Sequence, residues 1–240
     1  MIPEELALQA DELEEKKLRP MHVPWTTRDM LWGALSVLAW LVVFVAVGMV
    51  LPRVNIVLDV GLYIGLAELA MVIPVWWFTV HKYHVGYDRL GLRGFRLQDL
   101  LMGFGLMLLS FGFNAIYSLL LASFNLQMQV DVAPVFAELN SPWWLMAAGV
   151  LVAPVAEEIF FRSFIFGGLR ERFPWWKAAV ISSAIFAVLH MQLTAFLPIF
   201  ILGMIFSFLY QRSGSILPGL LMHIFTNALG LGAAYLVSLM

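Results

Sequence analysis

Seven apolar runs constrain the fold of this chain more than any other feature of its sequence. They cover residues 30–51, 58–80, 97–123, 143–168, 176–191, 193–211 and 215–238. A helix needs about 20 apolar residues to cross the ~30 Å hydrocarbon core of a bilayer, where helices satisfy their own backbone polar groups. Hydrophobic residues make up 62% of the 240 and charged residues only 12%, which is outside the range of soluble globular domains. We therefore predict an all-α, polytopic transmembrane helix bundle of about seven spans.

Two of these runs leave the number of spans open between seven and eight. The run 176–191 is short for a span. The run 97–123 is long enough to be kinked or divided at Gly103, Gly105 or Gly112.

The chain divides into a polar lead-in and a membrane part. Residues 1–28 carry apolar side chains at the spacing of a short amphipathic helix and lack the cationic start and apolar core of a signal peptide. We expect this segment to lie on the cytoplasmic membrane surface. Residues 29–240 are predicted to form a single transmembrane domain, with its chemistry-bearing core in 143–238.

The positions of the basic residues predict the orientation. Of the fourteen Lys and Arg, twelve lie before the first run or after the second, fourth and sixth runs, which is one side of the membrane. Arg53 lies on the opposite side and Arg162 lies within a helix. Because basic residues are retained in the cytoplasm, we predict a cytoplasmic N-terminus and an external C-terminus.

Charge and cysteine content exclude several classes of function. The net charge is only −2 and the charges lie mainly at ends and in loops, so the chain offers no electrostatic surface for nucleic acid. The chain contains no cysteine, which excludes disulfides, thiolate catalysis and cysteine-ligated metals. The predicted partners are membrane lipid and a peptide or protein substrate.

Three charged residues lie inside the fourth run. Glu157, Glu158 and Arg162 belong to the segment Ala-Pro-Val-Ala-Glu-Glu-Ile-Phe-Phe-Arg. A charged side chain at the bilayer centre costs roughly 2.5 to 3.5 kcal/mol on insertion scales, so such residues usually form pairs or serve a function. Glu158 and Arg162 are four residues apart and can pair on one helix face, whereas Glu157 is left without a partner.

Polar residues on two later helices are predicted to lie at the same depth as Glu157. His190 follows Phe186 by four residues, and Asn227 follows His223 by four. Counted from the nearest cytoplasmic basic residue at about 1.5 Å per residue, Glu157, His190, His223 and Asn227 all lie about 17 to 22 Å deep. A lone intramembrane His or Asn is often only an interhelical hydrogen bond. Polar groups from three helices at one level predict a site instead.

A carboxylate, two imidazoles and an amide suit hydrolysis of an amide. A Glu with a His can deprotonate a water, and a His with an Asn can donate to the oxyanion of a tetrahedral intermediate. No Gly-x-Ser-x-Gly or His-Glu-x-x-His motif occurs. Glu68, in the middle of the second run, could line the same cavity, accept a hydrogen bond or mark an ion path.

The residues in this order resemble the CPBP (Abi) intramembrane proteases, which include the type II CAAX prenyl endopeptidases and proteins of bacteriocin processing or self-immunity. The resemblance rests on Glu157-Glu158-x-x-x-Arg162, Phe186-x-x-x-His190 and His223-x-x-x-Asn227, and on Arg-Leu-Gly-Leu at 89–92. It implies a cavity open to the membrane and the cytoplasm. Glu157 and His190 would activate the water, and His223 and Asn227 would form the oxyanion site. Glu158 and Arg162 would support the helix.

The resemblance leaves metal, substrate and function class open. We expect no cofactor, because binding of zinc by Glu157, His190 and His223 would leave neither a carboxylate base nor an imidazole donor; zinc held by these three is the alternative. Substrates could be lipidated or not. A non-catalytic scaffold or immunity protein on the same fold is the second hypothesis. A proton-coupled transporter is the third, although the inverted repeats typical of transporters are not evident.

Overall fold

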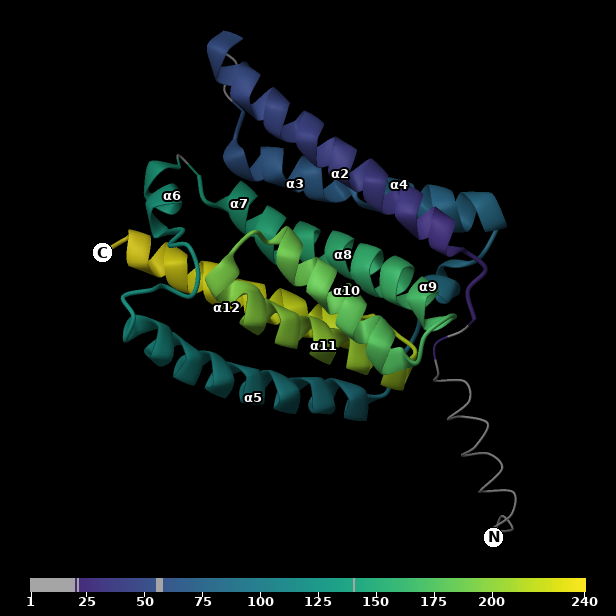
Figure 1. Cartoon of the computed structure of the whole chain (residues 1–240). Helices are drawn as coiled ribbons and strands as arrows, with labels where there is room; N and C mark the ends of the chain where they lie inside the picture. The colour runs from purple at the N-terminus through teal and green to yellow at the C-terminus, as the bar shows by residue number, and fades with distance from the viewer. Residues whose placement is uncertain (1–19, 21, 55–57, 140) are drawn as a thin grey trace.

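The structure, a computed structural model, describes residues 20, 22–54, 58–139 and 141–240, and all regular structure in these residues is helical (Figure 1). The helices are α2 (Thr27–Val50), α3 (Val60–Ala70), α4 (Val72–Trp76), α5 (Leu97–Ala122), α6 (Ala133–Glu138), α7 (Trp143–Ala147), α8 (Ala153–Glu157), α9 (Gly167–Arg170), α10 (Trp175–Leu189), α11 (Phe196–Ser213) and α12 (Leu217–Ser238). The π-helical segments are η2 (Trp77–His81), η4 (Ala148–Val152) and η5 (Glu158–Phe166), and the 3₁₀ turns are η1 (Leu51–Val54), η3 (Tyr87–Leu90) and η6 (Leu193–Ala195).

Within the described residues, six continuous helical stretches are long and apolar enough to cross a membrane. They are Thr27–Val54, Val60–His81, Leu97–Ala122, Trp143–Arg170, Leu193–Ser213 and Leu217–Ser238. The predicted polytopic helical bundle is thereby confirmed, and the chain is an integral, multi-pass membrane protein.

The remaining run, 176–191, gives the shorter helix α10. Its 15 residues reach only about 22 Å at 1.5 Å per residue, less than a bilayer core. The eighth span is not found, because α5 runs unbroken for 26 residues past all three glycines at which a division was considered. Of the predicted lead-in, residues 1–19 and 21 lie outside the described residues. Residues 20 and 22–26 precede α2, which begins at Thr27.

The start of α2 is fixed by polar contacts at one end of the bundle. Thr26 caps the helix, and its backbone N–H donates to Asp29. The Asp29 carboxylate also accepts from Lys82 Nζ at 2.5 Å and from Tyr83 Oη at 2.6 Å. The hydrogen bond to Asp29 raises the pKa of Lys82. These contacts join the first span to the end of the second.

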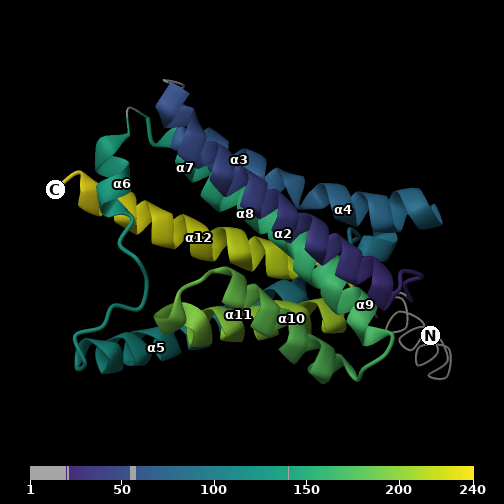
Figure 2. The same ribbon diagram turned by 45° about the horizontal axis from the view of Figure 1, so that its top comes forward.

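The stretch Trp143–Arg170 lies at the centre of the bundle (Figures 1 and 2). Its first half, α7 with η4, packs against α3 and α12, and its later half, η5, packs against α4, α10 and α11. α2 lies along α3 and α4 on one side of this stretch. The segment that carries the first sequence motif therefore contacts the helices that carry the other two.

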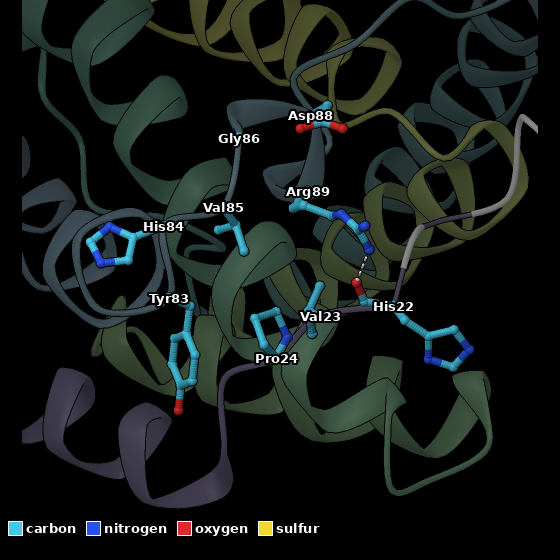
Figure 3. A pocket seen from close by; sticks show the side chains of 9 residues that line it. All are labelled: His22, Val23, Pro24, Tyr83, His84, Val85, Gly86, Asp88 and Arg89. Atoms are coloured by element: carbon cyan, nitrogen blue, oxygen red, sulfur yellow. Dashed lines mark hydrogen bonds between the residues drawn. The ribbon is translucent and has the colours of Figure 1, made fainter.

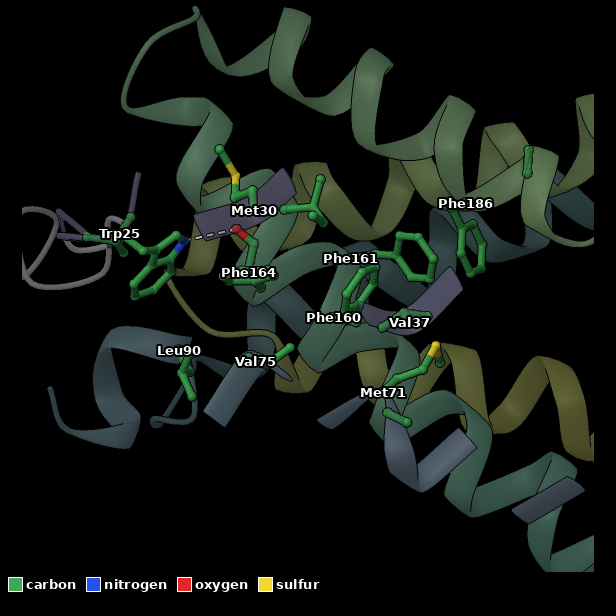
Figure 4. Packing of buried hydrophobic residues seen from close by; sticks show 14 of the residues in the cluster. Trp25, Met30, Val37, Met71, Val75, Leu90, Phe160, Phe161, Phe164 and Phe186 are labelled. Carbon is green, nitrogen blue, oxygen red and sulfur yellow. Dashed lines mark hydrogen bonds between the residues drawn. The ribbon is translucent and has the colours of Figure 1, made fainter. Parts of the chain in front are cut away.

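A cluster of aromatic side chains packs the inner part of the bundle (Figure 4). Phe160, Phe161 and Phe164 project from η5, and Phe186 reaches them from α10, with its ring centroid 5.0 Å from that of Phe161. Trp25 closes one end of the cluster, and its indole N–H donates to the Phe164 carbonyl at 3.0 Å. This packing joins η5 to α2 and α10.

Candidate active site

Glu158 and Arg162 form the ion pair that their spacing predicts. Arg162 Nη1 lies 3.1 Å from Glu158 Oε1, and each side chain is only 1% exposed. Both residues belong to η5, and the wider turn of a π-helix still places residues i and i+4 near one another. Short π-helical segments occur frequently at functional sites.

Aromatic rings surround the guanidinium of Arg162. Its Cζ lies 4.3 Å from the ring centroid of Phe186, 5.1 Å from that of Phe206 and 6.0 Å from that of Phe161. Desolvated cation–π contacts of this kind are worth about 2 kcal/mol. None of the three guanidinium nitrogens has a hydrogen-bond partner among the described residues. The rings and the ion pair with Glu158 therefore hold Arg162 in the interior, which gives Phe186 a supporting role.

His223 bridges the two neighbouring glutamates. Its Nδ1 lies 3.1 Å from Glu158 Oε1, and its Nε2 lies 3.4 Å from Glu157 Oε2. The sequence predicted no partner for Glu157 within its own helix. In the structure, His223 of α12 is its partner. The resemblance paired Glu157 with His190, whereas the imidazole found in contact with Glu157 is that of His223.

Hydrogen bonding fixes the roles of the two nitrogens of His223. Glu158 Oε1 also lies against Arg162, so as an ionised carboxylate it can only accept, and His223 Nδ1 is the donor. A neutral imidazole then carries its lone pair on Nε2, the atom that lies against Glu157. Glu157 is also the more exposed of the two glutamates, at 14% against 1% for Glu158, so it is the carboxylate that a substrate or water can reach.

His190 lies at the end of α10 and has the same tautomer. Its Nδ1 lies 2.8 Å from the Phe186 carbonyl, which can only accept, so this nitrogen carries the proton. The ring stands edge-on to that of Phe186, with centroids 4.7 Å apart. The ring of Phe186 in turn lies 6.0 Å from that of His223. The two imidazoles are thus neighbours of one phenyl ring.

Asn227 lies one turn beyond His223 on α12. Its Nδ2 donates to the carbonyl of Gly149 at 2.8 Å, and its side chain is half-buried. Residues of the three motifs thus lie around the central helical stretch, and Asn227 contacts its η4 segment.

Glu68 of α3 lies near this cluster. The α3 helix packs against η4 and α8, and Glu68 interacts with Glu157 as a like charge. Its Oε2 is buried and has no hydrogen-bond partner among the described residues. Glu68 therefore lies near the motif residues, and which of the three roles considered for it applies stays a prediction.

The predicted zinc alternative does not fit the side chains as they are arranged. Among the described residues, no group of three or more His, Asp or Glu side chains is placed to hold a metal ion. Two donors, His223 Nε2 and Glu157 Oε2, are adjacent, but a catalytic zinc takes three protein ligands.

Two contributors to the site were not found from the sequence. Phe206 of α11 stacks on His223, with centroids 5.1 Å apart and an interplanar angle of 26°, and also contacts Arg162. Gly149 supplies the carbonyl to which Asn227 donates. A phenylalanine or glycine in an apolar helix carries no signal that distinguishes it from its neighbours.

A pocket of about 630 Å³ opens away from this cluster, between the segment before α2 and the turn after η2 (Figure 3). Arg89 crosses it and donates to the His22 carbonyl at 2.7 Å. None of the motif residues is among the nine that line it, so we assign it no part in the chemistry.

Comparison with protein families supports the resemblance seen in the motifs. Residues 139–229 match the family described as "Type II CAAX prenyl endopeptidase Rce1-like". The matched residues include all three motifs, from Glu157 to Asn227. The family resemblance stated from the sequence is confirmed over this part of the chain.

Three curated bacterial proteins are similar over segments of comparable length. "Putative membrane peptidase YdiL" of Bacillus subtilis (strain 168) is 39% identical over 77 residues, which are 32% of each chain. "Uncharacterized 24.3 kDa protein" of Escherichia coli is 35% identical over 34% of this chain and 40% of its own length. "UPF0177 protein YxdF" of Lactococcus lactis is 32% identical over 33% and 44%. The matches thus span less than half of each relative. No solved structure matches the chain.

Proposed function

Because residues 139–229 match the type II CAAX prenyl endopeptidase Rce1-like family, we propose that the chain is an intramembrane endopeptidase. The observation that carries this proposal is the pair of contacts from His223 to Glu157 and Glu158. They place a neutral imidazole nitrogen beside the more exposed carboxylate, which is the arrangement that a general base needs.

The proposed nucleophile is a water held by Glu157 and His223 Nε2. Glu157 takes one proton from the water as the water oxygen attacks the peptide carbonyl. The resulting tetrahedral intermediate collapses when the C–N bond breaks and the nitrogen receives a proton. The products are a carboxylate and an amine, and no covalent enzyme intermediate forms. Glu158 keeps His223 Nδ1 protonated throughout.

Asn227 is the proposed oxyanion donor. One N–H of its amide is used by Gly149, and the second remains for the substrate. His190 supplies a second neutral imidazole, whose Nε2 can relay the proton to the leaving amine. These assignments exchange the roles that the family resemblance implied for the two histidines, because the contact with Glu157 comes from His223.

The proposed substrate is a peptide segment of a membrane or membrane-associated protein, lipidated or not, that reaches the site from the bilayer or the cytoplasm. The orientation proposed from the basic residues places the N-terminus in the cytoplasm and the C-terminus outside. The site then lies at membrane depth on the central stretch Trp143–Arg170.

The test is cleavage of a library of membrane-anchored peptides, with and without a prenylated C-terminus, by the purified protein in proteoliposomes. We expect the wild type to cleave a subset and Glu157→Gln to cleave none while keeping its melting temperature. The matched control is Glu138→Gln, which changes an exposed carboxylate at the end of α6 and should leave turnover unchanged. Binding without cleavage, equal for wild type and Glu157→Gln, would favour the scaffold, and substrate uptake into the vesicles would favour the transporter.

A further inference from the structure

The hydrogen bond from Asn227 to Gly149 fills a gap in the backbone hydrogen bonding of the central helix. Gly149 lies in η4, the π-helical segment that ends just before Pro154. In an α-helix, the Gly149 carbonyl would accept from the N–H of residue 153; in a π-helix, it would accept from that of residue 154.

Neither backbone donor serves this carbonyl. The N–H of Ala153 donates to Ala148, in the π-helical pattern. Continuing that pattern by one residue brings Pro154 opposite Gly149, and proline has no N–H. Gly149 lies within the membrane-crossing stretch Trp143–Arg170, where a carbonyl without a partner is costly, so an outside donor is required. The Asn227 amide supplies it at 2.8 Å.

The chemistry of the amide fixes its orientation. A backbone carbonyl only accepts hydrogen bonds, so the atom of Asn227 that faces Gly149 must be Nδ2 and not Oδ1. The side-chain amide is planar. Fixing one N–H on Gly149 therefore also fixes the direction of the second N–H and of Oδ1.

The absence of a side chain at Gly149 allows α12 to approach closely. A Cβ atom at this position would lie 2.4 Å from Leu231 Cδ1, one turn beyond Asn227. α12 packs directly on η4. Gly149 therefore permits the close approach of Asn227, and Pro154 makes the hydrogen bond from Asn227 necessary.

We propose that Pro154 is a positioning residue for Asn227: by leaving the Gly149 carbonyl without a backbone donor, it makes this carbonyl the fixed acceptor for Nδ2 and so orients the second amide N–H. The catalytic consequence rests on the proposed function, in which that N–H meets the oxyanion. The structural consequence is a coupling in stability between Pro154 and Asn227, and it does not depend on the proposed function.

The experiment is a double-mutant cycle with Pro154→Ala, Asn227→Ala and the combined variant, measured by thermal unfolding in detergent. Pro154→Ala restores an N–H that can reach Gly149. We expect Asn227→Ala to lower the melting temperature of the wild type, and to lower that of Pro154→Ala by much less. Pro74→Ala, which removes an interior proline from α4, is the matched control and should leave the cost of Asn227→Ala unchanged. An equal cost in the wild-type, Pro154→Ala and Pro74→Ala backgrounds would overturn the proposal.

Kinetics on the same variants test the catalytic consequence. Asn227→Ala should lower kcat by about 100- to 1000-fold. Pro154→Ala should lower kcat by up to about 100-fold with little change in KM, because a donor displaced by about 1 Å loses most of its effect. In the Asn227→Ala background, Pro154→Ala should cause no further loss. A further loss of the same size would show that proline acts independently of Asn227 and would overturn the positioning role.

A second variant keeps the test decisive if Pro154→Ala does not fold. Asn227→Leu keeps the size of the side chain without its donor and should melt below the wild type. Thr226→Val, its matched control, removes a hydroxyl that bonds within α12 to Met222. A wild-type melting temperature for Asn227→Leu would overturn the proposal. If the stability coupling is found but no peptide is cleaved, the positioning contact stands and the proposed function fails.

Discussion

Nδ1 of His223 lies 3.1 Å from Oε1 of Glu158, although 65 residues separate the two along the chain. The same oxygen lies 3.1 Å from Nη1 of Arg162. The same carboxylate oxygen of Glu158 therefore contacts the guanidinium of Arg162, from its own helix, and the imidazole of His223, from α12. Glu158 thus supports the central helix and also determines which nitrogen of the imidazole lies unprotonated against Glu157.

Glu158→Gln should destabilise the protein strongly. Removing one partner of a buried ion pair costs about 3 to 5 kcal/mol, because the other charge remains buried and unpaired. Activity should fall as well, because a Gln can present its own N–H to His223 and change the tautomer. Thermal or denaturant unfolding in detergent measures the loss of stability, and peptide cleavage measures the loss of activity.

Two controls separate the causes. Glu157→Gln makes the same change one residue earlier, at a side chain without the arginine contact, and should leave the melting temperature nearly unchanged. Glu158→Leu with Arg162→Met replaces the whole pair by apolar groups and should recover much of the stability without recovering activity. Equal melting losses for Glu157→Gln and Glu158→Gln would contradict the assignment.

Phe206→Leu should weaken both the ion pair and the imidazole. Its ring lies 5.1 Å from the Arg162 guanidinium and stacks on His223. Loss of a desolvated cation–π contact predicts a destabilisation of about 2 kcal/mol, measured by unfolding in detergent. The control is Phe208→Leu, two residues further along α11, where the ring packs on Trp175 instead. It should destabilise the protein less than Phe206→Leu. In an Arg162→Met background, the cost of Phe206→Leu should shrink; an undiminished cost would show that the ring contributes packing alone.

The helices and the ion pair could be predicted because they depend on local sequence. The ends of the seven apolar runs lie within three residues of the helical stretches, since hydrophobicity marks them directly. Glu158 and Arg162 pair because four residues close one helical turn. The shared depth of Glu157, His190, His223 and Asn227 stays a prediction, because it assumes an α-helical rise per residue and η5 is π-helical.

The partner of each side chain could not be predicted, because it depends on how each helix is rotated about its axis. The spacing of Glu157 and Glu158 predicts different faces, yet His223 reaches both with its two nitrogens. The π-helical segments η4 and η5 change the angle per residue on either side of α8, so a regular helical wheel misplaces the residues beyond them. Contributions from α3 and α11, such as Phe206, come from helices without a recognisable motif.

The proposed orientation can be tested by labelling, because the chain contains no cysteine to remove. Ser123→Cys, after α5, and a cysteine in place of the exposed Met240 should react with a membrane-impermeant maleimide on intact cells. Phe173→Cys, in the turn between α9 and α10, should react only after the cells are opened, because twelve of the fourteen basic residues lie on its side. Labelling of Phe173→Cys on intact cells, with Met240→Cys protected, would reverse the proposed orientation.

Activity should survive removal of metal ions. If zinc bound Glu157, His190 and His223, the site would have no carboxylate left to act as a base and no neutral imidazole left to transfer a proton. The imidazole of His223 is already placed against two carboxylates, and no three-donor group is formed in the described residues. We therefore expect peptide cleavage to continue at its full rate after dialysis against EDTA and 1,10-phenanthroline, and zinc content measured by mass spectrometry to stay well below one ion per chain. His190→Ala and His223→Ala should leave that zinc content unchanged. Stoichiometric zinc in active protein, lost with activity on chelation, restored with it on zinc addition and absent from both histidine variants, would instead make Glu157, His190 and His223 metal ligands.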